Sequence, residues 1–175
     1  RHVLLAAQLA HPSFREELEA YFTHRLQTLH EAPASLRETG DQALLPVVPW
    51  WQQHIQELKR IWQAIDGDLI AEFRRHAQAG RLELISSAAT HGFLPLLARD
   101  ESIRLQLLVG RAEHLRHFGE LPHGCWVPEC AYRPAGPWHP LPSAPAVPMR
   151  RGIEDHLRYA GFRWFFVDAH LAEAG

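Results

Sequence analysis

Apolar side chains recur along the first part of the chain at the three- and four-residue spacing of amphipathic helices. A first apolar stripe runs from Phe14 to Leu29. Ser13 and Glu16 have the spacing of a capping box, so we expect this helix to begin beside them. Pro33 and then Gly40 are expected to break it, because proline has no amide hydrogen for the next turn.

A second apolar stripe predicts a long helix from Trp51 to Phe73, with charged residues on its opposite face. The sequence Asp66-Gly67-Asp68 is expected to kink this helix, and Gly80 has the character of a C-terminal stop. We expect the aromatic residues of both stripes to form a core rather than to contact a cofactor. The same expectation applies to most of the six tryptophans.

From residue 80 onward, short apolar runs alternate with helical stretches. The runs at 82–85, 125–127 and 163–167 predict strands, and helices are expected at about 100–118 and 153–160. Strands joined by helices predict an α/β fold with a parallel sheet. The last run is almost continuously apolar, which favours a strand buried on both faces. The inward face of the helix expected at about 100–118 is predicted to consist of Leu105, Leu108, Ala112, Leu115 and Phe118.

A proline-rich stretch at 133–150 separates the second predicted strand from the helix after it. Its prolines, which lie between Pro134 and Pro148, predict a stiff excursion on the protein surface. We therefore expect three zones: a helical segment at 1–78, a βαβαβ portion at 80–175, and this loop within the second zone.

Polar side chains follow each of the three predicted strands. They are His91, Glu129, and the pair Asp168 and His170. The carboxyl ends of parallel strands meet at one edge of a sheet, so these side chains are expected to form the rim of an active site. The simpler alternative is that every strand has to end in something polar.

Glu129 is the strongest candidate for chemistry, because it ends a short buried run with aromatic residues on either side. Retaining glycoside hydrolases use two carboxylates about 5 to 5.5 Å apart, one of them as nucleophile. His91 is suited to bind a sugar hydroxyl or to orient a carboxylate. The alternatives are a solvated acid at a strand end and a buried histidine satisfied by the backbone.

The charge balance and the cysteine content limit the classes of partner. A net charge of −2 gives no electrostatic case for nucleic acid or an acidic membrane surface, and no apolar run is long enough for a membrane span. Two cysteines make no disulfide framework, so we expect a cytoplasmic location. Oligomeric state is left open. The chain lacks an initiator methionine, so its natural start is expected to lie upstream.

A metal site is the rival chemistry. The candidate zinc ligands are His91, His123, Cys125, Cys130 and His139, but they match none of the usual zinc-binding spacings. We therefore expect no metal and no cofactor.

A serine nucleophile is the other alternative. Ser86 and Ser87 lie near His91 in the sequence, but no third member of a catalytic triad is evident.

Two long motifs resemble glycoside hydrolase family 57. Gly124 to Pro134 is similar to the nucleophile region of that family, and Leu82 to Leu97 is similar to the region before it. These are the third and second of the conserved regions. The segments Ala64 to Ile70 and Phe165 to Leu171 also match, and the similarity runs from about Trp50 to the end. Within the family, the chain most resembles the 1,4-α-glucan branching enzymes.

The resemblance implies part of a distorted (β/α)7 barrel, spanning 1–175, that acts on α-1,4-glucans such as glycogen, amylose or starch. Glu129 would be the nucleophile of a retaining reaction that transfers a glucan chain to a 6-hydroxyl group. His91 and Trp126 would line the substrate-binding subsite. Within the family, 4-α-glucanotransferase and amylase-like hydrolysis are the alternatives. A metal-dependent polysaccharide deacetylase and a non-catalytic glucan-binding fragment are alternatives of other classes.

The chain also departs from the family pattern. The His-x-His signature of the first region has no counterpart here, and the acid/base aspartate of the family lies downstream of the segment that matches at 165–171. We do not assign that role to Asp168. The chain is therefore expected to be the middle piece of a longer enzyme and to be inactive on its own.

Overall fold

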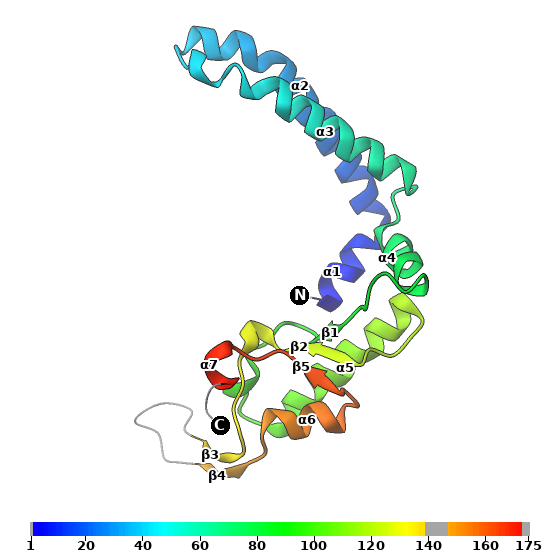
Figure 1. Cartoon of the computed structure of the whole chain (residues 1–175), viewed down its shortest axis with the longest axis vertical. Helices are drawn as coiled ribbons and strands as arrows, with labels where there is room; N and C mark the ends of the chain where they lie inside the picture. Colours follow the sequence, from blue (N-terminus) through cyan, green and yellow to red (C-terminus); the bar gives the residue numbers. More distant parts are fainter. Residues whose placement is uncertain (1, 139–146, 173–175) are drawn as a thin grey trace. The chain divides into compact units, whose positions relative to one another are not determined.

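The computed structural model describes residues 2–138 and 147–172. The chain divides into two compact units, residues 8–72 and residues 1–7 together with 73–175. Figure 1 shows the elements of both units. No helix in the described ranges is long and apolar enough to cross a membrane. Helices α1 (His2–Leu9) and α4 (Leu69–Gln78) each extend across a boundary between the units.

The unit at 8–72 is a helical hairpin of α2 (Pro12–Glu38) and α3 (Val47–Ala64), joined through a short 3-10 helix (Gln42–Leu44). Its buried centre consists of Phe22, Ile55 and Trp62. The ring of Phe14 meets Trp62 edge-on, at 6.0 Å between centroids. The predicted aromatic stripes form a core only in part, because Phe14, Phe22 and Trp62 belong to it whereas Tyr21, Trp51 and Phe73 are exposed. Partly buried residues around it are Leu18, Leu26, Leu29, Ile65 and Leu69.

The ends of these helices differ in part from the prediction. Helix α2 begins at Pro12 and is capped by His11, whose Nδ1 accepts a hydrogen bond from the amide of Ser13 at 3.2 Å. The predicted capping box is wrong, because proline fits the first helical position and so places Ser13 inside the helix. The expected kink is confirmed as a full break between α3 and α4, where Asp66 and Gly67 have φ angles of 51° and 66°.

Pro33 was predicted to break α2, and this is wrong, because the helix continues to Glu38. A proline inside a helix deprives the carbonyl four residues earlier, here that of Leu29, of its hydrogen bond. Nε2 of Gln52 on α3 donates to this carbonyl at 3.0 Å. The neighbouring helix thus supplies the donor that proline lacks, and a pattern within one helix does not reveal it.

We expect Gln52→Ala to weaken the hairpin by about 1 to 2 kcal/mol, because it leaves the partly buried Leu29 carbonyl without its donor. Hydrogen exchange of the amides around Pro33 measures this as faster local opening. Gln53→Ala, at an exposed position beside it, is the matched control. Equal exchange in both variants would contradict this account of Pro33.

The unit at 73–175 contains a parallel sheet, as predicted, and its strands lie in the order β1-β2-β5. The strand predicted at 82–85 is wrong, because the first strand of the sheet begins only at Ser86. The second strand has the predicted length but begins one residue earlier, and the third lies within its predicted range but is shorter. The strands are β1 (Ser86–Ser87), β2 (Gly124–Trp126) and β5 (Trp164–Phe165).

Helices α5 (Asp100–Phe118) and α6 (Ile153–Tyr159) cover one face of this sheet and form its core (Figure 1). The buried residues of this core are Ala88, Leu94, Ile103, Leu107, Cys125, Val127, Ile153, Leu157, Ala160 and Phe162.

The predicted inward face of α5 is wrong. Leu105, Leu108, Ala112 and Leu115 are exposed and Phe118 is half-buried, whereas Ile103, Leu107 and Gly110 are buried together with His114 and His117. Apolar residues occur on both faces of this helix, so their spacing alone does not select one. The buried face is the one on which Gly110 permits close contact with β1.

The other face of the sheet is aromatic and exposed. Trp164 lies directly over Gly124, which has no side chain to obstruct it. Phe166 and Val167 are also exposed, so the expectation that this strand is buried on both faces is wrong for the described residues. The core prediction for tryptophan holds only for Trp62 and Trp138. The exposed tryptophans are Trp50, Trp51, Trp126 and Trp164.

The proline-rich stretch forms an antiparallel pair, β3 (Gly136–Trp138) and β4 (Val147–Arg150). The predicted surface excursion is wrong at its base, because Trp138 is buried and its indole N–H donates to the carbonyl of Pro95 at 2.8 Å. Residues 139–146, among them the candidate ligand His139, lie outside the described residues.

Two buried histidines, His117 and His156, predict a loss of stability in acid. Burial is the main reason why the pKa of each ring lies below its usual value near 6.5. Below that pH the unfolded chain binds protons before the folded chain does, so stability present above pH 6.5 is lost as the pH falls.

We expect the free energy of unfolding to fall by up to about 1.4 kcal/mol per pH unit for each of these histidines. Urea unfolding between pH 8 and pH 5 measures the slope. His156→Gln should reduce it, and the same exchange at the exposed His24 is the matched control. An equal slope in wild type and His156→Gln would contradict the role of His156.

Candidate active site

The structure brings together the side chains that follow β1 and β2. His91 comes four residues after β1, and Glu129 lies in the short 3-10 helix Pro128–Cys130 that follows β2. Nε2 of His91 lies 3.1 Å from Oε1 of Glu129. Because β1 and β2 are parallel neighbours, their carboxyl ends deliver both residues to the same edge of the sheet.

Both residues have unusual backbone geometry. The φ angles of His91, Glu129 and Cys130 are 59°, 56° and 50°, in the left-handed region that non-glycine residues rarely occupy. Such conformations cost roughly 1 to 3 kcal/mol and concentrate at functional sites. The turns that hold them are closed by backbone bonds from His91 to Ala88 and from Cys130 to Val127.

Helix α5 holds the His91 turn in place. The amide of Ala89 donates to the carbonyl of Gln106 at 3.0 Å, and the amide of Thr90 donates to the side-chain oxygen of the same residue at 2.9 Å. Gly110, one turn further along, lies against the backbone of Ser87. The turn is therefore packed against and hydrogen-bonded to a helix rather than surrounded by solvent.

The two side chains differ in their access to solvent. The side chain of Glu129 is 70% exposed, whereas that of His91 is 23% exposed. The carboxylate is therefore open to an incoming ligand, while the imidazole is held behind it. With its proton on Nε2, His91 donates a hydrogen bond to the carboxylate and so orients it.

An aromatic row lies beside this pair on the exposed face of the sheet. The Trp126 ring lies 5.5 Å from that of Phe166, and Phe166 lies 5.3 Å from Trp164. The carbonyl of Trp126 accepts a hydrogen bond from Ser87 Oγ at 2.8 Å, which ties β1 to β2. Flat aromatic faces suit sugar rings. Phe166 and Trp164 were not predicted as site residues, although their two-residue spacing in an extended segment indicates that both lie on one face.

The third strand end reaches the same region. Burial, and then the negative charges of Asp168 and Glu129, raise the pKa of the Cys130 thiol. The contact between the rings of Trp126 and Phe166 likewise brings the chain after β5 close to the end of β2. The side chain of His170 lies outside the described part of the structure.

The rival chemistries gain no support from the described residues. None of their His, Cys, Asp and Glu side chains form a group of three that could hold a metal ion. Cys125 is buried, and burial raises the pKa of its thiol to about 12, so it stays protonated. The hydroxyl groups of Ser86 and Ser87 are buried and donate to backbone carbonyls.

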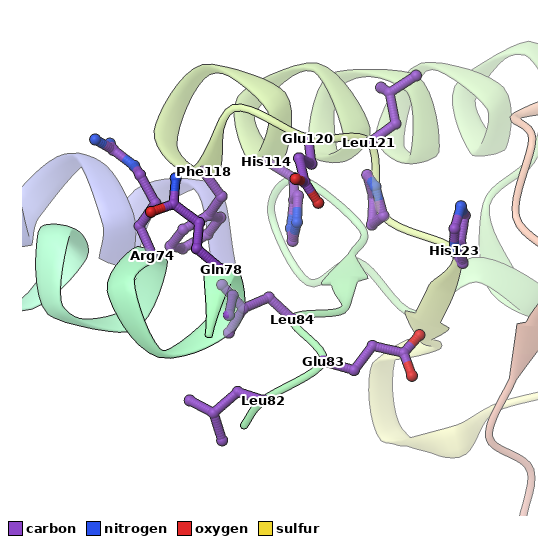
Figure 2. A pocket seen from close by; sticks show the side chains of 12 residues that line it. Arg74, Gln78, Leu82, Glu83, Leu84, His114, Phe118, Glu120, Leu121 and His123 are labelled. Atoms are coloured by element: carbon purple, nitrogen blue, oxygen red, sulfur yellow. The ribbon is translucent and has the colours of Figure 1, made fainter. Parts of the chain in front are cut away.

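A cavity of about 180 Å³ lies near the opposite ends of the strands (Figure 2). Its walls include residues just before β1, such as Glu83, and just before β2, such as His123, together with Arg74 and His114. None of His91, Trp126 and Glu129 lines it. The strand ends with the predicted site residues therefore remain the candidate active site.

Comparison with known proteins identifies relatives across nearly the whole chain. The family model described as Glycosyl hydrolase family 57 matches residues 7–174. The 1,4-α-glucan branching enzyme of Thermococcus kodakarensis is 41% identical over 172 residues, which are 98% of this chain and 24% of that protein. The chain thus spans about a quarter of the length of this relative.

Similar solved structures also include branching enzymes. A branching enzyme from Pyrococcus horikoshii matches with a TM-score of 0.88 and 38% identity, over 98% of this chain and 32% of that one. The Thermococcus enzyme, in complex with glucose, matches with a TM-score of 0.84 and 40% identity, over 97% and 30%. An α-amylase from Thermotoga maritima shares the fold, with a TM-score of 0.73 and 21% identity, over 95% and 29%.

Proposed function

Because the chain belongs to glycosyl hydrolase family 57, we propose that it is the part of a 1,4-α-glucan branching enzyme that supplies the nucleophile. The observation that carries this proposal is the contact between His91 and the exposed carboxylate of Glu129 at the ends of adjacent parallel strands. The similarity to two branching enzymes over nearly the whole chain supports the choice of reaction.

In the proposed reaction, a carboxylate oxygen of Glu129 attacks the anomeric carbon of an α-1,4-glucan. The bond to the leaving chain breaks as the glycosyl ester forms, and an acid elsewhere in the whole enzyme protonates the leaving oxygen. The 6-hydroxyl of another glucan then attacks the ester, gives up its proton to the same acid/base group, and releases Glu129. The product carries an α-1,6 branch.

His91 orients the nucleophile, and Trp126 provides an aromatic face for the sugar ring beside the scissile bond. Glucan, as glycogen, amylose or starch, is the proposed substrate. The strands β1, β2 and β5 are proposed to be adjacent members of a (β/α)7 barrel, of which this chain supplies a part. A cytoplasmic setting is proposed as well, and the two free cysteines are compatible with it.

The test is to incubate the full-length protein with amylose and to count α-1,6 linkages by proton NMR before and after a debranching enzyme. We expect new α-1,6 linkages with little increase in reducing ends. Redistribution of chain lengths without branches would indicate a 4-α-glucanotransferase instead, and a large gain in reducing ends would indicate hydrolysis. Either result would contradict the proposed branching reaction.

A further inference from the structure

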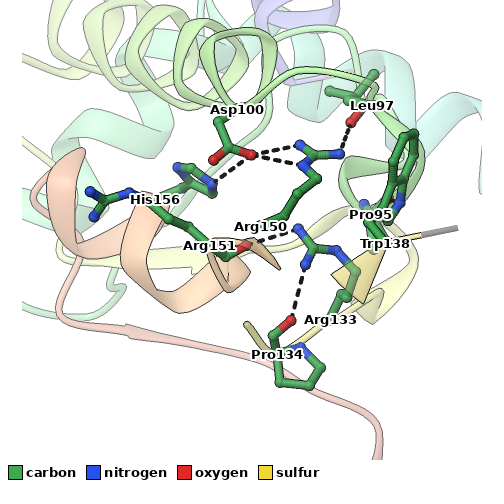
Figure 3. A network of polar contacts seen from close by, with 9 residues as sticks. All are labelled: Pro95, Leu97, Asp100, Arg133, Pro134, Trp138, Arg150, Arg151 and His156. Atoms are coloured by element: carbon green, nitrogen blue, oxygen red, sulfur yellow. Dashed lines mark hydrogen bonds and ion pairs between the residues drawn. The ribbon is translucent and has the colours of Figure 1, made fainter. Parts of the chain in front are cut away.

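Arg150, at the end of β4, lies at the centre of a buried polar network (Figure 3). Its Nε and Nη2 atoms donate to Oδ1 of Asp100 at 3.0 and 2.7 Å, and Nη1 donates to the carbonyl of Leu97 at 2.7 Å. Its guanidinium group lies 4.7 Å from the centroid of the Trp138 ring. The side chain of Arg150 is only 6% exposed. All three nitrogen atoms of its guanidinium group therefore donate to the surrounding chain.

The acceptors of this network belong to the segment that follows His91. Pro95, which accepts from Trp138, and Leu97, which accepts from Arg150, come four and six residues after His91. This segment includes the short 3-10 helix Leu94–Leu96, and it leads into α5, where Asp100 is the first residue. The contacts from β3 and β4 therefore hold the C-terminal side of the His91 turn, while Gln106 holds its N-terminal side.

The donors of the network belong to the segment that follows Glu129. Arg133, four residues after Glu129, donates through Nη2 to the carbonyl of Arg151 at 2.9 Å. The carbonyl of Arg133 in turn accepts from the amide of Ile153 at 3.0 Å. These bonds close the base of the β3–β4 pair, as Figure 3 shows in part. A continuous set of contacts thus joins the chain after Glu129 to the chain after His91.

We propose that Arg150, together with Asp100 and Trp138, is a positioning unit that fixes the separation of the loops bearing His91 and Glu129. This inference rests on the proposed function of that pair. A buried ion pair adds little net stability compared with apolar packing, but its directional bonds fix orientation. Arg150 touches neither His91 nor Glu129, so it acts through the two loops and is not itself a catalytic residue.

The first test compares Trp138→Phe and Arg150→Lys with wild type in the full-length enzyme. Phenylalanine keeps an aromatic ring over the guanidinium but removes the donor to Pro95. Lysine keeps the charge but lacks the fork that reaches both Asp100 and Leu97. We expect kcat for glucan transfer to fall about 10- to 100-fold in each variant, with KM changed less than about 2-fold. The matched control is Arg158→Met on α6, an exposed arginine, which should leave kcat unchanged.

The second test separates positioning from general stability. In the His91→Ala background the position of the His91 loop no longer matters for transfer, so Trp138→Phe should add less than about 2-fold to the loss. If the two substitutions acted independently, their fold-losses in kcat would instead multiply. The proposal is overturned if folded Trp138→Phe keeps wild-type kcat, or if its fold-effect is the same in both backgrounds. If the proposed function itself is wrong, Glu129→Gln retains transfer, and this result distinguishes that failure from a failure of the positioning role alone.

Discussion

Replacing Glu129 by glutamine in the full-length protein is expected to lower the rate of glucan transfer by roughly four orders of magnitude. An amide oxygen does not displace a glycosidic oxygen, so the covalent step is lost. Glutamine keeps the size of the side chain and an oxygen that accepts from His91. Because the side chain of Glu129 is 70% exposed, folding should be unaffected.

The measurements for this variant are the initial rate on amylose and the midpoint of thermal unfolding. The matched control is Glu17→Gln, at an exposed position on α2, which should keep full activity. Transfer by Glu129→Gln within 10-fold of wild type, with the fold intact, would contradict the assignment of the nucleophile.

Gly110→Ala is expected to cause the largest loss of stability in the unit at 73–175. A Cβ atom at this position would lie 2.0 Å from the carbonyl oxygen of Ser87, and backbone atoms do not yield as a flexible side chain does. Either α5 or the end of β1 has to move. We expect a destabilisation of about 3 kcal/mol, despite the better helix propensity of alanine.

The same displacement shifts the turn that carries His91, so transfer activity should fall together with stability. Urea unfolding and the amylose assay measure the two effects. Gly136→Ala is the matched control, since nothing lies within 4 Å of its Cβ position. A Gly110→Ala protein with wild-type stability would show that α5 does not hold β1 as described.

The parallel direction of the three strands could be predicted from the sequence, because alternating apolar runs and helices leave few topologies. The meeting of His91 and Glu129 followed from the same topology, since neighbouring parallel strands deliver their carboxyl ends to one edge. Short-range patterns and simple connectivity were sufficient for these features.

The remaining features depend on partners that are distant in the sequence. The continuation of α2 beyond Pro33 depends on the hydrogen bond from Gln52, and the burial of Trp138 depends on the carbonyl of Pro95. The buried face of α5 is chosen by the fit of Gly110 against Ser87, not by apolar spacing. Periodicity within one element contains no information about such contacts between elements.

The left-handed backbone at Glu129 was likewise not evident from the sequence, because the residue types there do not require it. Glycine would be the usual choice for such a φ angle. The strain at His91, Glu129 and Cys130 instead accompanies the placement of a reactive pair, as functional sites often show.

In the proposed mechanism, Glu129 forms a covalent bond to the glucan. The most direct test treats the full-length protein with a slowly hydrolysed activated fluoroglycoside, digests it with protease and maps the labelled peptide by mass spectrometry. We expect a glycosyl adduct on the carboxylate of Glu129. An adduct on a different carboxylate, such as that of Asp168, would contradict it.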